Sequence, residues 1–305
     1  NFEGVDEEDI TYVLDDAITV SVPFNTNLSA LVTTITISDG ASVSHASGEA
    51  VDFIDGEAVP FTVTAADGVS QKVYNVIINT RGEIGNGSRL KTHRVDNGWG
   101  GSDAITLTSY TYDATSNFVN ELTIEQNAQT RVYTLVYNSN NQVIEKKSNN
   151  PVVSTVYTYN DKGQIATGTF KENDVLIATY TYVYDVTSVN YVSKSRLAAA
   201  DNTTELTTFE YDENNNVTTE NRDGVILIYT YDNKNNPFTG IYPLAYAKIK
   251  AGTGVFPRTV TTNNVITYGV NTTIHSYTYT YNTANYPLTA TLIASGEVLR
   301  FMYYE

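Results

Sequence analysis

The sequence VYTYNDKGQI, residues 156–165, contains the pattern that decides the fold of this chain. Two tyrosines separated by one residue end a run of strand-forming residues. The next residues, Asn160 to Gly163, are of the types that tight turns prefer, and the apolar Ile165 begins another run. The stretch is therefore expected to form one β-hairpin.

The same pattern recurs along most of the chain. Its copies end at Tyr112, Tyr137, Tyr159, Tyr184, Tyr211, Tyr231, Tyr281 and Tyr303. Successive spacings are 25, 22, 25, 27, 20, 50 and 22 residues, so the long spacing is twice the usual one. A period of this size indicates a repeat architecture. Consecutive hairpins predict an all-β fold in which an antiparallel meander makes a curved or spiral sheet.

Side chains alternate between the two faces of the predicted strands. Tyr180, Tyr182 and Tyr184 fall on one face of residues 179–185, whereas threonine and valine fall on the other. We interpret the tyrosine face as the core of the sheet and the threonine face as exposed to water. The alternative is that the tyrosine rings are open and present their faces to a sugar.

Composition excludes several classes of function. The chain has 34 acidic and 18 basic residues, for a net charge of −16, which argues against nucleic acid and anionic membrane surfaces as partners. It has no cysteine, so disulfides and zinc–thiolate sites are excluded, and no cofactor is expected. No stretch approaches the roughly 20 apolar residues of a membrane-spanning helix. Because the sequence starts at Asn1, we expect an exported product whose leader, with an anchoring lipid, lay upstream.

Residues 1–81 are predicted to form a small β-sandwich. Short β-runs at residues 18–22, 31–37, 59–65 and 72–78 alternate with turn signals such as Asp67-Gly68. The stretches ITISDGASVSHASGEAVDF (35–53) and PFTVTAADGVSQKVYNVIIN (60–79) resemble immunoglobulin-like or cadherin-like modules of Bacteroidetes surface lipoproteins. That resemblance covers about residues 17–79 and implies a spacer that precedes the functional domain.

Residues 88–305 are predicted to be a separate repeat domain, after a glycine-rich boundary at about 81–87. The stretches VYTYNDKGQI and FEYDENNNV (209–217) resemble the YD, or RHS-type, repeat. Asn replaces the motif Asp in several copies, and the turn glycine is clear only at Gly163. The chain is similar to Bacteroidetes surface lipoproteins with degenerate YD repeats. Some eight units are too few for the closed capsules of toxin carriers.

The doubled spacing marks an insertion within the repeats. Pro243 and the following residues to Lys250 predict one short helix, and residues 258–267 predict a hairpin that turns at Asn263-Asn264. Insertions that interrupt a repeat often line a functional face, so residues 237–275 are the candidate region for function.

Aromatic residues in or near this region and one isolated tryptophan are the candidate ligand-binding residues. They are Trp99, Tyr242, Tyr246, Phe256 and Tyr268. Asp212, Asn214 and Asn216 have the opening spacing of a calcium loop, although the closing Gly and Glu are missing. The alternative is an ordinary hairpin turn, which can have the same residue types at these positions.

No catalytic residues are predicted. His45, His93 and His275 lie far apart in the sequence, and acids such as Glu205, Glu210 and Asp212 are in or near turns, where carboxylates have structural roles.

The favoured hypothesis is an exported, non-enzymatic cell-surface or periplasmic protein, anchored to the outer membrane, whose repeat domain binds a glycan or another surface protein. The alternatives are a carbohydrate hydrolase with a site near residues 237–275 and a purely architectural envelope module.

Overall fold

Strands make up 58% of the chain and helix only 2%, which confirms the all-β prediction. The structure is a computed structural model. It describes residues 1–3, 11–14, 17–23, 26–54, 56–81, 89–96, 105–114, 116–186, 188–250, 260–270 and 273–304.

The N-terminal strands form two small sheets. They are β1 (Thr11–Leu14), β2 (Ala17–Pro23), β3 (Leu31–Val32), β4 (Ser42–Val43), β5 (Ala50–Val51), β6 (Ala58–Thr64) and β7 (Gln71–Arg81). One sheet has the order β1-β2-β7-β6-β4, and β3 pairs with β5 in the other. Both sheets contribute to one core, in which Val22 and Ile78 have no exposed surface and Phe53 stacks on Phe61. Most predicted strands are present, but the predicted strand 31–37 shortens to the two residues of β3.

The remaining strands form the second part of the molecule. They are β8 (Leu90–Asp96), β9 (Thr106–Tyr112), β10 (Val119–Gln126), β11 (Gln129–Tyr137), β12 (Val143–Asn149), β13 (Val152–Tyr159), β14 (Ile165–Glu172), β15 (Val175–Tyr184), β16 (Tyr191–Ala198), β17 (Thr204–Tyr211), β18 (Val217–Arg222), β19 (Val225–Tyr231), β20 (Val265–Val270), β21 (Thr273–Tyr281), β22 (Pro287–Leu292) and β23 (Val298–Tyr303). Each strand pairs antiparallel with the next one, as the meander predicts.

The meander closes into a barrel of sixteen strands, so the prediction of a curved or spiral sheet was wrong in this respect. The last strand, β23, pairs antiparallel with the first, β8, and Phe301 lies opposite His93. Closure removes both free edges of the sheet, whose unpaired backbone groups would otherwise face water. Side-chain alternation specifies the two faces of a strand, but it does not reveal that the end strands meet.

The two ends of the barrel have different turns. At one end, the hairpins β10–β11 and β14–β15 turn at Asn127-Ala128 and Asn173-Asp174, and both residues of each pair have positive φ. This is the backbone of the two-residue turn that suits the twist of a hairpin. At the other end lie the longer turns of the Tyr-x-Tyr-Asp/Asn pattern, which we call the motif-turn end.

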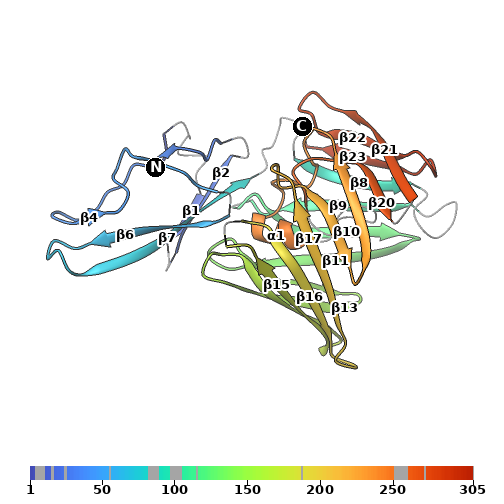
Figure 1. The fold of residues 1–305 in the computed structure, drawn as a ribbon, viewed down its shortest axis with the longest axis horizontal. Helices are drawn as coiled ribbons and strands as arrows, with labels where there is room; N and C mark the ends of the chain where they lie inside the picture. Colours follow the sequence, from blue (N-terminus) through green and yellow to red (C-terminus); the bar gives the residue numbers. More distant parts are fainter. Residues whose placement is uncertain are drawn as a thin grey trace.

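The N-terminal sheets lie beside the barrel (Figure 1). A point of contact is Gly163 in a motif turn. A Cβ built on this glycine would be 3.4 Å from the Ile77 side chain of β7 and 3.7 Å from the Gly56 carbonyl oxygen. The motif-turn end therefore faces the N-terminal unit here.

The single predicted helix is present as α1 (Leu244–Ile249). Pro243 precedes its first residue, and the Pro243 carbonyl accepts bonds from the N–H groups of Tyr246 and Ala247 at 3.0 and 2.9 Å. Tyr246, Ala247 and Ile249 belong to the buried cluster of the barrel, so α1 packs against the inner face of the strands (Figure 1).

Candidate binding site inside the barrel

The tyrosines of the repeat face the inside of the barrel. Tyr110, Tyr182 and Tyr229 are buried in one cluster, and the second tyrosine of every motif except Tyr281 packs against it. The threonine between two motif tyrosines points outward, where Thr158 and Thr167 on paired strands share a hydrogen bond of 2.6 Å. The interpretation of the tyrosine face as the core is confirmed.

The hydroxyl group of the second tyrosine fixes each repeat to the one before it. It donates to a backbone carbonyl at the start of the strand that immediately precedes its own strand in the meander, at 2.5 to 3.0 Å. The donor–acceptor pairs are Tyr112–Leu90, Tyr137–Val119, Tyr159–Val143, Tyr184–Ile165, Tyr211–Tyr191, Tyr231–Val217 and Tyr303–Pro287. The doubled spacing departs from this rule, because Tyr279 bonds to Val265 and Tyr281 bonds to the Asp232 carboxylate.

The Asp or Asn that follows the second tyrosine organises the turn. The Asn160 N–H donates to the Gln164 carbonyl at 2.9 Å, and the Gln164 N–H donates back to Asn160 Oδ1 at 3.0 Å. The fourth residue of this turn, Gly163, has a φ of +77°, and Asn141 and Asn215 have positive φ at the same place in their own turns. Asn tolerates this conformation, which explains why the turn glycine is not repeated.

The calcium-loop candidate is one of these turns. Asp212 Oδ1 accepts the N–H groups of Asn214 and Asn216 at 2.9 Å, and Asp212 Oδ2 accepts the Asn216 side-chain amide at 3.2 Å. The carboxylate is thus already engaged in turn bonds, and the calcium assignment stays a prediction. Across the residues that the structure describes, no three His, Asp or Glu side chains gather into a group that could hold a metal ion.

The insertion is an enlarged motif turn and not a degenerate repeat. Strand β19 pairs directly with β20, and Asp232 bonds to Asn264 just as Asp212 bonds to Asn216. The predicted hairpin turning at Asn263-Asn264 is therefore wrong, because Asn264 closes a turn that begins at Asp232. We call the described residues of this insertion, 233–250 and 260–263, the plug.

The described plug residues enter the barrel and are held there by both backbone and side chains. The Val119 N–H, at the start of β10, donates to the Ile241 carbonyl at 3.0 Å. Ile241 has no exposed surface, and Phe238 packs edge-on against His93 and Phe301, which lie opposite each other on the paired strands β8 and β23. The plug thus fills the inside of the barrel at the motif-turn end.

The predicted ligand-binding residues are divided among several places. Tyr242 and Tyr246 pack against each other inside the barrel, with ring centroids 5.4 Å apart, and both are almost fully buried. Tyr268 faces inward from β20 and stacks on His275 at 4.6 Å. Trp99 and Phe256 lie outside the described residues. A role in ligand binding stays a prediction for all five.

Two lysines that the sequence reasoning missed lie among these rings. Lys146 is opposite the buried Leu135 in the β11–β12 register, so it faces inward, and its ammonium group lies 4.5 Å from the Tyr133 ring centroid. Lys250, directly after α1, lies 4.4 Å from the Tyr242 centroid and 5.2 Å from that of Phe238. Strand alternation at Lys146-Lys147 could have indicated that one of these two lysines faces inward.

Desolvation acts on both lysines. It lowers the pKa of Lys146, and it lowers the pKa of Lys250 to about 7, with a further lowering from the charge of Lys146. Taken as whole residues, both lysines are partly exposed. Their ammonium groups are surrounded by protein, since desolvation is the main cause of both pKa shifts.

His93 lies close to Lys250 on the neighbouring wall. Its Nδ1 is 2.9 Å from the Tyr110 hydroxyl, and its side chain is almost fully buried. Burial, followed by the charge of Lys250, lowers the pKa of His93 to about 3. The imidazole is therefore neutral at physiological pH, and the two lysines are the nearby groups that can carry a positive charge.

A separate polar network lies on the opposite side of the interior. Glu220 has no exposed surface and accepts bonds from Arg222 Nε at 2.7 Å and from the Tyr229 hydroxyl at 2.9 Å. The paired charges compensate each other, as buried ions require.

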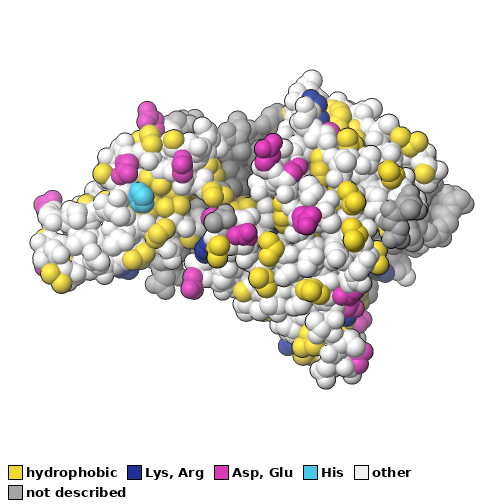
Figure 2. Space-filling view, in the orientation of Figure 1, with side chains coloured by type: hydrophobic (Ala, Val, Ile, Leu, Met, Phe, Trp, Pro, Cys, Tyr) yellow, Lys and Arg dark blue, Asp and Glu magenta, His cyan; other side chains and the backbone are white. Residues whose placement is uncertain are grey.

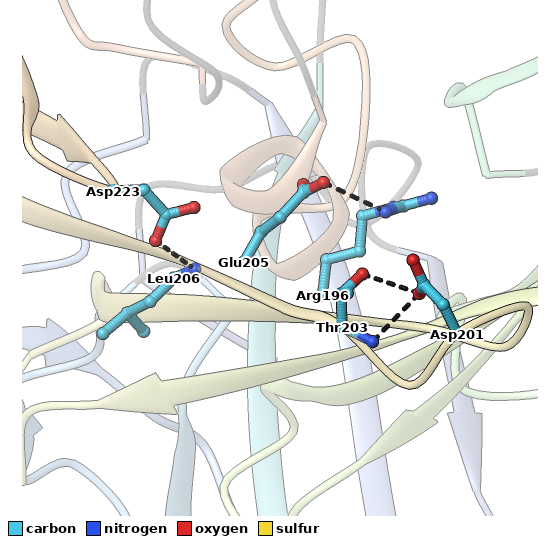
Figure 3. Close-up of polar contacts among 6 residues, drawn as sticks. All are labelled: Arg196, Asp201, Thr203, Glu205, Leu206 and Asp223. Atoms are coloured by element: carbon cyan, nitrogen blue, oxygen red, sulfur yellow. Dashed lines mark hydrogen bonds and ion pairs between the residues drawn. The ribbon is translucent and has the colours of Figure 1, made fainter.

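The acids considered for hydrolysis have structural contacts. Glu205 pairs with Arg196 across β16–β17 at 3.2 Å, and it is 58% exposed (Figure 3). In the same group, Asp201 caps its turn by accepting bonds from Thr203, and Asp223 accepts the Leu206 N–H at 3.1 Å (Figure 3). These carboxylates stabilise hairpin ends at the surface.

Two hollows lie outside the barrel interior. A cleft of about 770 Å³ opens in the N-terminal unit and is lined by apolar residues, threonines and the rings of Phe61 and Tyr74. A groove of about 500 Å³ runs over the outer face of β19 and β20, along Ile226, Ile228 and Ile274. Figure 2 shows apolar side chains dispersed over the barrel surface, with acidic side chains prominent and few basic ones visible.

Comparison with known proteins gives one match to a family model. Residues 6–78 match the family described as SGBP, N-terminal. No curated protein sequence matches the chain. Among the helices of the described residues, none has the length and apolar character needed to cross a membrane.

Among solved structures, a porin-like protein from Bacteroides uniformis shares the fold. Its identity is 15% and its TM-score 0.51, over 72% of this chain and 98% of that one. The match to a putative glycoside hydrolase from Bacteroides thetaiotaomicron has 15% identity and covers 68% of this chain and 79% of that one. Its TM-score of 0.24 is too low to indicate a shared fold.

Proposed function

We propose that this is an exported cell-surface protein that binds a glycan without hydrolysing it. The observation that carries the proposal is the match of residues 6–78 to the N-terminal family of SGBP, surface glycan-binding proteins. In this proposal the protein is located at the cell surface and is anchored to the outer membrane.

The binding site is proposed to lie in the barrel, with the N-terminal unit as the spacer that carries it. Sugars bind well to aromatic faces, because a ring offers apolar area and tyrosine adds a polar hydroxyl group. The barrel concentrates such rings on its inner face, and the plug brings further rings to them. The acidic exterior, with a chain net charge of −16, fits a protein that does not bind nucleic acid or anionic membranes.

Binding of the full chain to a glycan array, followed by calorimetric titration with each positive glycan, tests the proposal. We expect saturable binding and no release of new reducing ends during prolonged incubation. Replacing Tyr268 by Ala tests the inner face, and Tyr74→Ala in the N-terminal cleft serves as the comparison. Release of reducing ends would favour a hydrolase, and failure to bind any glycan would favour an architectural module.

A further inference from the structure

Lys146 and Lys250 place two amine groups inside the barrel, and neither is paired with a carboxylate of a described residue. Neither ammonium group makes an ion pair with a residue that the structure describes, and their partners are the rings of Tyr133, Tyr242 and Phe238. The two lysines are close enough for the charge of Lys146 to disfavour the charge of Lys250. Like charges placed together in a desolvated environment are unfavourable unless an anion joins them.

The Tyr242 hydroxyl is a second, independent sign of a missing partner. It is buried, and among the described residues it has no hydrogen-bond partner. The Lys250 ammonium group lies against the ring of the same tyrosine, 4.4 Å from its centroid. A buried hydroxyl group without a partner, on a ring that contacts the Lys250 ammonium group, is an arrangement that an acceptor oxygen would complete.

We propose that Lys146, Lys250 and Tyr242 form a subsite for the anionic group of an acidic saccharide, either a uronic-acid carboxylate or a sulfate ester. The proposal rests on the proposed function and specifies its ligand class. The ammonium groups and the phenol donate charge-assisted bonds to the anionic oxygens, and nearby rings such as Tyr133 offer an apolar face to the sugar. As whole residues, both lysines are partly exposed.

Matched lysine variants of the full chain test this subsite. The probes are an oligogalacturonide, a sulfated chondroitin oligosaccharide, a neutral xylo-oligosaccharide, and free acetate and sulfate. Lys146→Met and Lys250→Met keep the side-chain length and remove the charge. Lys147→Met is the control, because Lys147 is exposed on the same strand and pairs with Glu145 at 3.2 Å.

We expect at least one acidic oligosaccharide to bind. Its Kd should rise at least tenfold in Lys146→Met and in Lys250→Met, and less than twofold in Lys147→Met. Lys146→Arg, which keeps the charge, should recover part of the affinity, and this variant guards against a mere folding defect. Tyr242→Phe should weaken binding to a smaller extent.

Three results would overturn the inference. Acidic oligosaccharides could bind equally well to the Met variants, or only the neutral oligosaccharide could bind. In both cases the proposed glycan-binding function stands while the anionic subsite fails. If free acetate or sulfate binds at the lysines and no saccharide binds, the site is a small-anion site and the proposed function fails as well.

Discussion

Tyr159 shows at the scale of one residue how the repeat works. Its ring packs against the core of the barrel, and its hydroxyl group donates to the Val143 carbonyl at 2.8 Å. The same side chain therefore supplies buried area and satisfies a backbone acceptor on another strand. The recurrence of this bond explains why tyrosine, and not phenylalanine, occupies the second position of the motif.

Replacing Tyr159 by Phe should lower the free energy of unfolding by about 1 kcal/mol, because the Val143 carbonyl loses its donor while the ring remains. Urea denaturation followed by circular dichroism measures the change. Thr181→Val, at an exposed outward position between two motif tyrosines, should change stability by less than about 0.5 kcal/mol. An equal effect of both substitutions would contradict a special role for the hydroxyl group.

His93 should make stability depend on pH. Its folded pKa of about 3 is below the usual 6.5, so between these values the unfolded chain binds a proton that the folded chain does not. The free energy of unfolding should therefore fall as the pH falls from 6.5 towards 4, by about 1.4 kcal/mol per pH unit in the middle of this window.

Stability measurements at pH 5 and pH 7 on the His93→Gln variant test this. We expect the variant to lose most of the difference between pH 7 and pH 5, whereas His45→Gln in the N-terminal unit should keep it. An unchanged pH dependence in His93→Gln would show that other groups are responsible.

At the scale of elements, the plug makes one motif turn unlike the others. The Asp232–Asn264 bond keeps the hairpin closed, so the inserted residues leave and return at the same point. This arrangement lets the insertion fill the barrel without disturbing the register of β19 and β20.

Ile241→Ala should therefore destabilise the protein by about 2–5 kcal/mol, because the side chain is fully buried and its removal leaves a cavity. The urea midpoint measures the loss. Leu288→Ala on the outer face of β22, where the leucine is 41% exposed, should cost far less. Equal costs at the two positions would mean that the plug is not packed as described.

At the scale of the whole molecule, two buried cores share no residue. One surrounds Val22 and Ile78 in the N-terminal sheets, and the other fills the barrel. The contact at Gly163 connects the two parts without merging their cores. We therefore expect two unfolding transitions.

Differential scanning calorimetry on two core variants tests this expectation. Phe53→Ala should lower the midpoint of one transition, and Leu299→Ala should lower that of the other, since each side chain belongs to a different core. If either substitution lowers both midpoints equally, the two parts unfold as one unit.

Most of the local structure was predictable from the sequence, but the candidate site was predictable only in part. Turn residues and alternation correctly indicated hairpins, the buried face and the helix after Pro243. They also pointed to the insertion between Tyr231 and Tyr281. Lys146 was missed because its inward direction matters only once a plug and other strands surround it.

The sequence by itself determined the repeat, the hairpins and the inner tyrosine face, because these depend on local turn chemistry and on the two-residue period of a strand. Only the tertiary structure decided that β23 meets β8, that the insertion turns inward, and that Lys146 and Lys250 come together among rings. These features join residues that are distant in the chain. The local sequence pattern does not indicate which distant residues come into contact. The packing of the closed barrel determines these contacts.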